Sequence, residues 1–262
     1  MGRTHRAAYT SAMRPFPKSH LVPLFFSLGV GLSGCESERD KLLRRVRETR
    51  ECVGCELVGA QLEGAELSGA RLGQATLRDA RLSGVNLRGA DLSEARLTSA
   101  DLRRADLREA RLEGAYVLGA RFTEANLEGA DLRSANSLEG ADFEGANLQR
   151  ARLAGTRFVG PAGPFQRTER SHYYSVPSGG ANLARADLRE ADLREASLAR
   201  CNLQGARLQG ALLHEASFEG ADLRGAELSG ADLQGVRFEN AIWVDGTHCG
   251  PRSVGRCVPG PP

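Results

Sequence analysis

Leucine or phenylalanine returns at every fifth position along most of this chain, and alanine stands two positions before it. In the stretch ADLRRADLREA, Leu102 and Leu107 are two such centres, preceded by Ala100 and Ala105. An α-helix, which advances about 100° per residue, would turn successive centres roughly 140° apart, so no apolar face would form. A flat strand would send residues five apart to opposite faces. The period therefore excludes both elements over this region.

The five-residue unit fills a first block, residues 51–160, and a second block, residues 181–245. The centre and the small position two before it carry no charge, whereas the other three columns hold nearly all of the Arg, Asp and Glu. Two columns are therefore expected to point inward and three outward. A coil that bends once per unit satisfies this pattern, because every centre then faces one shared axis.

Glycine recurs two positions after the centre, which is where a type II turn beginning at the centre needs positive φ. Gly59 and Gly84 are examples. About half of the units carry another residue there, such as Glu94, Arg104 or Glu109. We expect the turns of those units to be of another type.

These residues and their spacing resemble the pentapeptide-repeat family over about two-thirds of the chain. The resemblance implies an all-β fold, a right-handed quadrilateral β-helix with four units per coil, here interrupted by one loop insertion. At a strand spacing of about 4.8 Å, eight or nine such coils would make a rod of roughly 40 Å.

The register of the repeat has one fault. Between ADLRS and ADFEG the chain reads ANSLEG, and we assign the extra residue to Ser137, which predicts a bulge at one corner. Counting through it places Phe122 and Phe143 one coil apart on one face, as Phe218 and Phe238 also are. Each pair is expected either to stack or merely to replace leucines.

The repeat stops once, in PAGPFQRTERSHYYSVPSGG at residues 161–180. In register this segment would place a poor core at the centres, and its length equals about one coil. We therefore predict a loop that leaves the faces before and after it aligned. It is either an inert insertion or a partner-binding loop, since aromatic residues and arginine are frequent at interfaces. The candidate contact residues are Phe165, Arg167, Arg170, His172, Tyr173 and Tyr174.

Residues 1–34 have the pattern of a secretory signal: a basic start, the short apolar run LVPLFFSLGVGL, and small residues before a cut. The ending Leu32 to Cys35, LSGC, resembles a bacterial lipoprotein signal, which implies lipidation of Cys35. The alternative is an ordinary signal with a coincidental cysteine. Glu36 would, by the same resemblance, favour the outer membrane. We expect translation to begin at Met13, which leaves a signal of ordinary proportions.

Both ends of the repeat are expected to carry caps, because a solenoid otherwise exposes its edges. Residues 35–50 are charged, with apolar residues at helical spacing, and predict a short helix or a tether. Residues 246–262 form a tail with a disulfide loop. We expect this loop and Trp243, the sole tryptophan, to cover the other end.

The cysteines fit an oxidising compartment. Cys52 and Cys55 are the first and fourth residues of one predicted turn, whose Cα atoms lie within disulfide reach. The rival readings of this CxxC are a redox motif and half of a zinc site. Cys249 and Cys257 follow the last unit and predict a second structural disulfide. Cys201 occupies an inward alanine position, where a buried thiol is expected.

No catalytic, cofactor or metal motif is recognisable, so we expect neither an enzyme nor a cofactor. The family also offers a different class, the quinolone-resistance type that imitates DNA and binds a topoisomerase. Mimicry requires a strongly negative surface. Removal of residues 1–34 takes away four of the 35 basic residues and leaves 31 against 33 acidic ones, which is close to neutral. Basic runs that would indicate nucleic-acid binding are also missing.

The sequence therefore predicts a membrane-anchored lipoprotein that acts as a scaffold or protein-binding rod in the bacterial cell envelope. The expected partners are the membrane, through the anchor at Cys35, and an unidentified envelope protein or cell-wall component. The alternative is the topoisomerase-binding DNA mimic.

Overall fold

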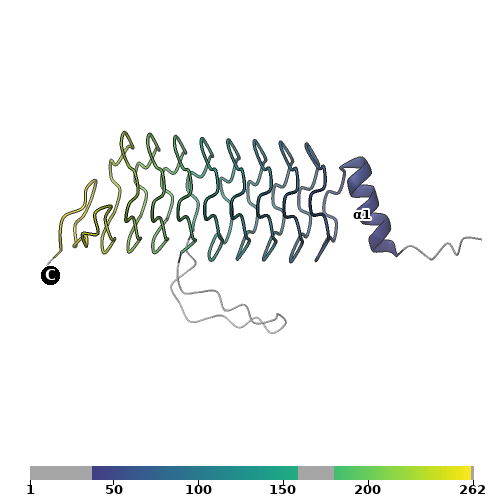
Figure 1. The fold of residues 1–262 in the computed structure, drawn as a ribbon, viewed down its shortest axis with the longest axis horizontal. Coiled ribbons are helices and arrows are strands. Elements are labelled where there is room, and N and C mark those ends of the chain that lie inside the picture. The colour runs from purple at the N-terminus through teal and green to yellow at the C-terminus, as the bar shows by residue number, and fades with distance from the viewer. Residues whose placement is uncertain (1–36, 159–179, 261–262) are drawn as a thin grey trace, which may run out of the picture. The chain divides into compact units, whose positions relative to one another are not determined.

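The computed structural model describes residues 37–158 and 180–260 (Figure 1). The chain divides into Met1–Glu36, which lies outside the described residues, and Ser37–Pro262. Within the described residues the one helix is α1, Glu38–Thr49, and the remainder is a stack of coils. Extended strands are absent from this part of the chain, where single residues form parallel bridges instead.

Each coil contains twenty residues and pairs with the next at four positions. Glu51 bridges Arg71, Glu56 bridges Thr76, and the other two bridges of this coil follow the same twenty-residue step. Backbone hydrogen bonds run along the axis, as in Leu102 N–H to Arg121 C=O at 2.8 Å. The described residues therefore form a quadrilateral β-helix with one bridged residue on each wall of each coil.

The core consists of the two predicted inward columns. Leu102 and Ala100 are fully buried, and so are the other centres and small residues through the middle of the stack. The bridged residue between them, here Asp101, lies on the outer wall. Because two small or medium side chains per unit fill the interior, the coil stays narrow and its stability comes from contacts with neighbouring coils.

The expectation that units without glycine use another type of turn is wrong, because the third residue of their turns has the same positive φ. Glu94, Arg104 and Glu109 have φ of 57°, 57° and 60°, within a few degrees of the glycines at the same position. Ala95 N–H still donates to Leu92 C=O, which closes the turn at 3.0 Å. The reason is tertiary: in most turns the third residue donates to the next coil, as Glu94 N–H does to Glu113 C=O at 2.8 Å, so its backbone path is fixed whatever its side chain.

The bulge at Ser137 is confirmed. Tyr116 bridges Asn136 twenty residues on, whereas Arg121 bridges Asp142 twenty-one residues on. Ser137 is exposed and has φ of 55°, while Leu138 returns to the buried centre column. The extra residue is thus accommodated on the outside of one corner, and the inward columns continue in register.

Both predicted phenylalanine pairs stack in the core. The rings of Phe122 and Phe143 are parallel with centroids 4.7 Å apart, and those of Phe218 and Phe238 are 5.5 Å apart. Phe158 adds an edge-on contact with Phe143 at 6.2 Å. Since the first pair is separated by 21 residues, its stacking also supports the count through the bulge.

The coils on either side of residues 161–180 pair directly with each other. Asp142 bridges Asn182 and Arg157 bridges Ser197, which are steps of forty residues rather than twenty. Ala181 N–H donates to Phe158 C=O at 3.2 Å, the bond that closes an ordinary turn. The segment predicted as an inserted loop lies outside the described residues, apart from its last member, Gly180.

Helix α1 lies against the first coil (Figure 1). Ser37 is its N-cap and accepts a hydrogen bond from Asp40 N–H at 3.1 Å, and Arg50 ends it in the left-handed conformation. Val46 is fully buried. Of the two alternatives for residues 35–50, the structure has the helix over residues 38–49.

The tail folds back on the last coil. Arg237 and Val254 form an antiparallel bridge, and Phe238 N–H donates to Ser253 C=O at 2.8 Å. Asn240 N–H donates to Cys249 C=O at 2.9 Å. These backbone donors would otherwise point beyond the end of the stack, so the tail satisfies part of an open edge.

Candidate binding surface

Several predicted site residues lie outside the described part of the chain. They are the lipidation candidate and the loop residues, namely Cys35, Phe165, Arg167, Arg170, His172, Tyr173 and Tyr174.

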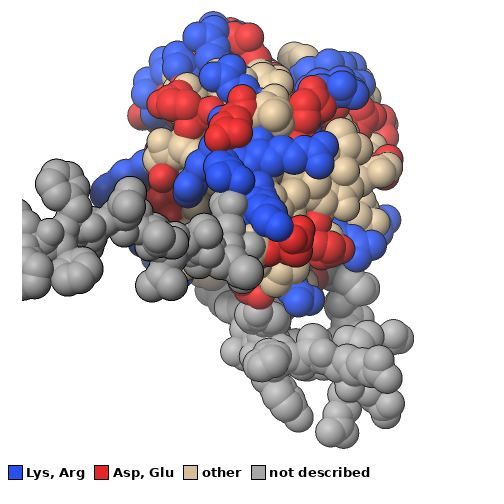
Figure 2. All heavy atoms as spheres, turned by 90° about the vertical axis from the view of Figure 1, so that its right-hand side faces the viewer, with Lys and Arg blue, Asp and Glu red and all other residues tan. Residues whose placement is uncertain are grey.

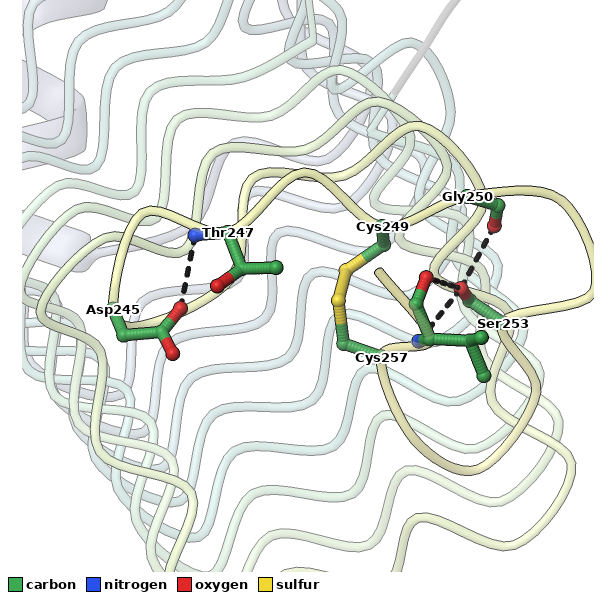
Figure 3. Close-up of a disulfide and its surroundings, with 7 residues drawn as sticks. Asp245, Thr247, Cys249, Gly250, Ser253 and Cys257 are labelled. Carbon is green, nitrogen blue, oxygen red and sulfur yellow. Dashed lines mark hydrogen bonds between the residues drawn. A yellow bond between two sulfur atoms is a disulfide. The ribbon is translucent and has the colours of Figure 1, made fainter. Parts of the chain in front are cut away.

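Both predicted disulfides are present, one near each end of the stack. Cys52 and Cys55 join the ends of the first turn, with Cα atoms 5.4 Å apart. Cys249 and Cys257 close the terminal loop, with Cα atoms 5.1 Å apart (Figure 3). The pairing of Cys52 with Cys55 agrees with the prediction of a structural disulfide and disagrees with half of a zinc site. Within the described residues, no group of three or more His, Cys, Asp or Glu could hold a metal ion.

The terminal disulfide covers the end of the core. Ser253, itself buried, donates from Oγ to Gly250 C=O at 2.7 Å and accepts from Val258 N–H at 3.0 Å (Figure 3). Trp243 packs edge-on against Phe238 with ring centroids 4.8 Å apart. This network holds the loop against the last coil.

Cys201 is free and buried in the small inward column. Burial raises the pKa of its thiol to about 12. A thiolate is the reactive form, so this cysteine has the properties of a packing residue rather than a nucleophile.

A repeated ion pair covers the walls. In units of the form Asp-Leu-Arg, the arginine returns two residues later and binds the aspartate with two nitrogens, as Arg103 does with Asp101 at 2.7 and 2.6 Å. The same aspartate oxygen accepts the Arg103 backbone N–H at 3.3 Å. The Arg103 hydrogen bond is the main reason that the pKa of Asp101 lies below its ordinary value. These carboxylates are thus engaged in structural pairs.

One wall, the Glu51 wall, alternates in charge along the axis. Ion pairs join Arg71 to Glu51 at 3.5 Å and Arg111 to Asp91 at 3.8 Å. Farther along, Leu212 interrupts the alternation and is 43% exposed. The Glu51 wall consists of Glu51, Arg71, Asp91, Arg111, Asp131, Arg152, Asp192, Leu212 and Asp232.

The neighbouring wall differs, because five of its nine bridged residues are uncharged. We name it the Glu56 wall, and it consists of Glu56, Thr76, Arg96, Tyr116, Asn136, Arg157, Ser197, Ser217 and Arg237.

An open groove of about 560 Å³ runs along this wall through the first five coils. It lies between the bridged residues and the adjacent turn corner. Tyr116 is 45% exposed there. The lining residues are Gly54, Glu56, Gln74, Thr76, Glu94, Arg96, Gly114, Tyr116 and Asn136.

Hydrogen bonds along the axis orient several of the lining side chains. Thr76 Oγ1 donates to Glu56 Oε1 at 3.2 Å, and Gln74 Nε2 donates to Glu94 Oε2 at 3.1 Å. By contrast, neither Arg96 nor Tyr116 uses its side chain in a hydrogen bond or ion pair with any described residue. The groove therefore combines fixed acceptors with a guanidinium and an aromatic ring that have no partner in this part of the chain.

The irregularities of the repeat surround the same wall. The turn closed by Cys52–Cys55 precedes the first bridged residue of the Glu56 wall, and Gly54 of that turn lines the groove. On the opposite side of the wall, Ser137 and the turn bond from Ala181 to Phe158 occupy one corner.

This groove was not predicted from the sequence. Tyr116 gave the available signal, since it is an aromatic residue in an outward column that elsewhere holds mainly charged or small polar side chains. Glu94, Arg96 and Tyr116 come together because residues twenty apart lie on consecutive coils, so the groove belongs to no single five-residue unit.

Acidic and basic side chains are interspersed over the end of the solenoid that carries α1 (Figure 2). The walls repeat this mixture through their ion pairs. None of the described helices is both long and apolar enough to cross a membrane.

These features define a repeat solenoid with paired charges on its walls. The chain belongs to the pentapeptide-repeat family, whose profile, described as pentapeptide repeats, matches in eight copies over residues 55–93, 100–136, 137–160, 179–214 and 201–240.

Solved structures of other repeat proteins are similar to this chain. HetL, a pentapeptide repeat protein involved in heterocyst differentiation regulation from the cyanobacterium Nostoc sp. strain PCC 7120, is 35% identical; the match covers 79% of this chain and 98% of HetL, with a TM-score of 0.26. QnrB1, a plasmid-mediated fluoroquinolone resistance protein, is 21% identical over 72% of this chain and 90% of that one, with a TM-score of 0.32. No curated protein sequence gives a significant match.

Proposed function

We propose that this protein is a non-enzymatic, lipid-anchored binding rod of the bacterial cell envelope. The observation that carries the proposal is the pair of disulfides at the two ends of the stack. Structural disulfides form and persist in oxidising compartments such as the periplasm and the cell surface. The signal-like residues 1–34 and the LSGC ending at Cys35 support the same compartment.

The anchor is tested by replacing Cys35 with Ser in the full-length chain and growing cells with a labelled fatty acid. We expect the variant to lose the label and to remain unprocessed. Cys201→Ser is the matched control, because Cys201 is free and buried, and it should keep the label. Labelling that persists in Cys35→Ser would contradict the lipid anchor.

The binding role is assigned to residues 161–180 as a partner-binding loop. Support comes from their composition, with three aromatic residues, a histidine and two arginines, and from the direct pairing of the flanking coils. Such pairing allows a segment of about one coil to leave the stack without displacing the walls on either side.

Crosslinking on living cells, followed by identification of co-purified proteins, tests this role. The parent chain should capture an envelope protein, and a variant that joins Gly160 to Ala181 should not. A second variant, which keeps the loop length but replaces Phe165, Tyr173 and Tyr174 with Ser, should also lose capture. Capture that survives the deletion would place recognition on the walls, and recovery of a topoisomerase would favour the DNA-mimic alternative.

A further inference from the structure

We propose that the groove on the Glu56 wall binds a linear glycan whose sugars carry N-acetyl and carboxylate groups. This inference deepens the proposed function, since such glycans belong to the cell envelope. The groove is open, and most of its lining is polar. Pockets for compact apolar ligands are instead concave and mainly apolar, so the shape favours an extended polar ligand.

The spacing of the wall suits a polymer. Thr76, Arg96 and Tyr116 stand on consecutive coils, and consecutive coils are separated by about 4.8 Å. This distance is comparable to the length that one pyranose ring adds to a linear glycan. Five coils therefore offer successive sugars evenly spaced side chains over a length of roughly 20 Å.

The side chains provide the groups that sugars require. The exposed ring of Tyr116 has an apolar face that can pack against the C–H face of a pyranose, and a hydroxyl at its rim. Glu56 and Glu94 can accept hydrogen bonds from hydroxyl and amide groups, and Gln74 can pair with an acetamido group.

Arg96 selects for a carboxylate. Its bridged neighbour on the next coil is Tyr116, and its guanidinium has no hydrogen bond or ion pair within the described residues. Other bridged arginines are instead paired with a carboxylate of the preceding coil, as Arg71 is with Glu51 and Arg152 with Asp131. A carboxylated sugar would supply the two oxygens that a guanidinium binds most strongly.

Two other classes of polymer fit less well. Nucleic acid needs an excess of basic groups, whereas the groove holds two glutamates and one arginine. A peptide that adds a strand needs an open edge. Here the backbone is already paired between coils. Thr76 N–H donates to Cys55 C=O at 2.8 Å, and Leu97 N–H donates to Tyr116 C=O at 2.7 Å.

The test uses the full-length protein in detergent and measures its binding to three probes. These are cell-wall glycan strands freed of their peptides, neutral oligomers of N-acetylglucosamine, and a lipopolysaccharide O-chain. We expect the carboxylated wall glycan to bind tightest. Tyr116→Ala should weaken binding of both N-acetylated probes by about tenfold. Arg96→Gln should remove the preference for the carboxylated glycan over the neutral oligomer.

Matched controls lie on other walls: Arg121→Gln, a bridged arginine one wall further, and Leu212→Ala, an exposed apolar residue of the Glu51 wall. Both should bind the probes as the parent does, and all four variants should have the parent's melting temperature. Absence of binding to every probe, or equal effects of the control variants, would overturn the proposal. Preference for the O-chain would overturn the N-acetylated class. Because binding is measured in detergent, failure of the Cys35 anchor would leave this result unaffected.

Discussion

An aspartate on these walls serves two partners at once, since one oxygen accepts a backbone N–H and both face an arginine. Asp101 shows this with Arg103. Asn86, at an equivalent position, retains the backbone bond, accepting Arg88 N–H at 3.1 Å. The acceptor therefore adds one backbone hydrogen bond to the turn, and the charge adds a separate contribution.

Asp101→Asn should accordingly cost less than Asp101→Ala. The asparagine keeps the backbone acceptor and loses an exposed ion pair, so we expect a loss of less than about 1 kcal/mol in unfolding free energy. The alanine loses the acceptor as well and should cost about 1 kcal/mol more. Urea unfolding of the full chain measures both, and equal costs would show that the acceptor contributes nothing.

The same pairs predict how stability depends on pH. Hydrogen bonds from the arginine two residues later lower the pKa of five aspartates below the ordinary value. A lowered folded-state pKa gives stability that is present above the unfolded pKa of about 4 and is lost as the pH falls below it. The aspartates are Asp101, Asp106, Asp131, Asp192 and Asp222.

We therefore expect a melting temperature that is nearly constant from pH 7 to about pH 5 and falls steadily below about pH 4. Thermal melts across this range measure it. A melting temperature that rises on acidification would mean that these carboxylates are repelled in the folded chain rather than stabilised.

At the scale of the five-residue unit, the inward columns were predictable because burial repeats locally. The two uncharged columns, represented by Leu102 and Ala100, are already recognisable within one unit. The bulge at Ser137 followed from counting. The positive φ of Glu94 did not, since it is imposed by Glu94 N–H donating to Glu113 C=O on the next coil. The groove around Tyr116 was missed for the same reason: it is made between coils.

Two substitutions at the turn corner should have opposite effects. Ser99 has φ of 57°, and Gly84 has φ of 66° with open space where a Cβ would stand. Gly84→Ala introduces left-handed strain and should cost about 1–2 kcal/mol. Ser99→Gly removes strain but frees the unfolded chain, so its gain should stay below about 1 kcal/mol. Chemical unfolding measures both, and a stabilising Gly84→Ala would contradict the left-handed corner.

Joining Gly160 to Ala181 should leave the solenoid intact. The bond from Ala181 N–H to Phe158 C=O is already that of a turn, so the deletion restores an ordinary four-residue corner of sequence FVGA. We expect unchanged circular dichroism and a melting temperature within a few degrees of the parent.

The control removes one residue more, joining Gly160 to Asn182. This shift places a polar residue in the small inward column and moves every later centre outward, so the second block should unfold. Equal behaviour of the two deletions would show that the register across the junction does not matter.

At the scale of the whole molecule, each coil contacts only its neighbours, so the ends should open before the middle. The two disulfides lie at those ends, whereas Cys201 is buried in the small inward column away from them. Mild reduction should therefore loosen the caps without unfolding the stack.

Thiol alkylation after mild reduction measures this order. Cys52, Cys55, Cys249 and Cys257 should be labelled first, and hydrogen exchange should rise in the first and last coils alone. Cys201 should stay unlabelled until denaturant is added, because its thiol is buried and its pKa is raised to about 12. A Cys201→Ala variant identifies its label by mass. Labelling of Cys201 together with the four terminal thiols would mean that the coils open as one cooperative unit, and the disulfides would then stabilise the whole stack rather than its ends.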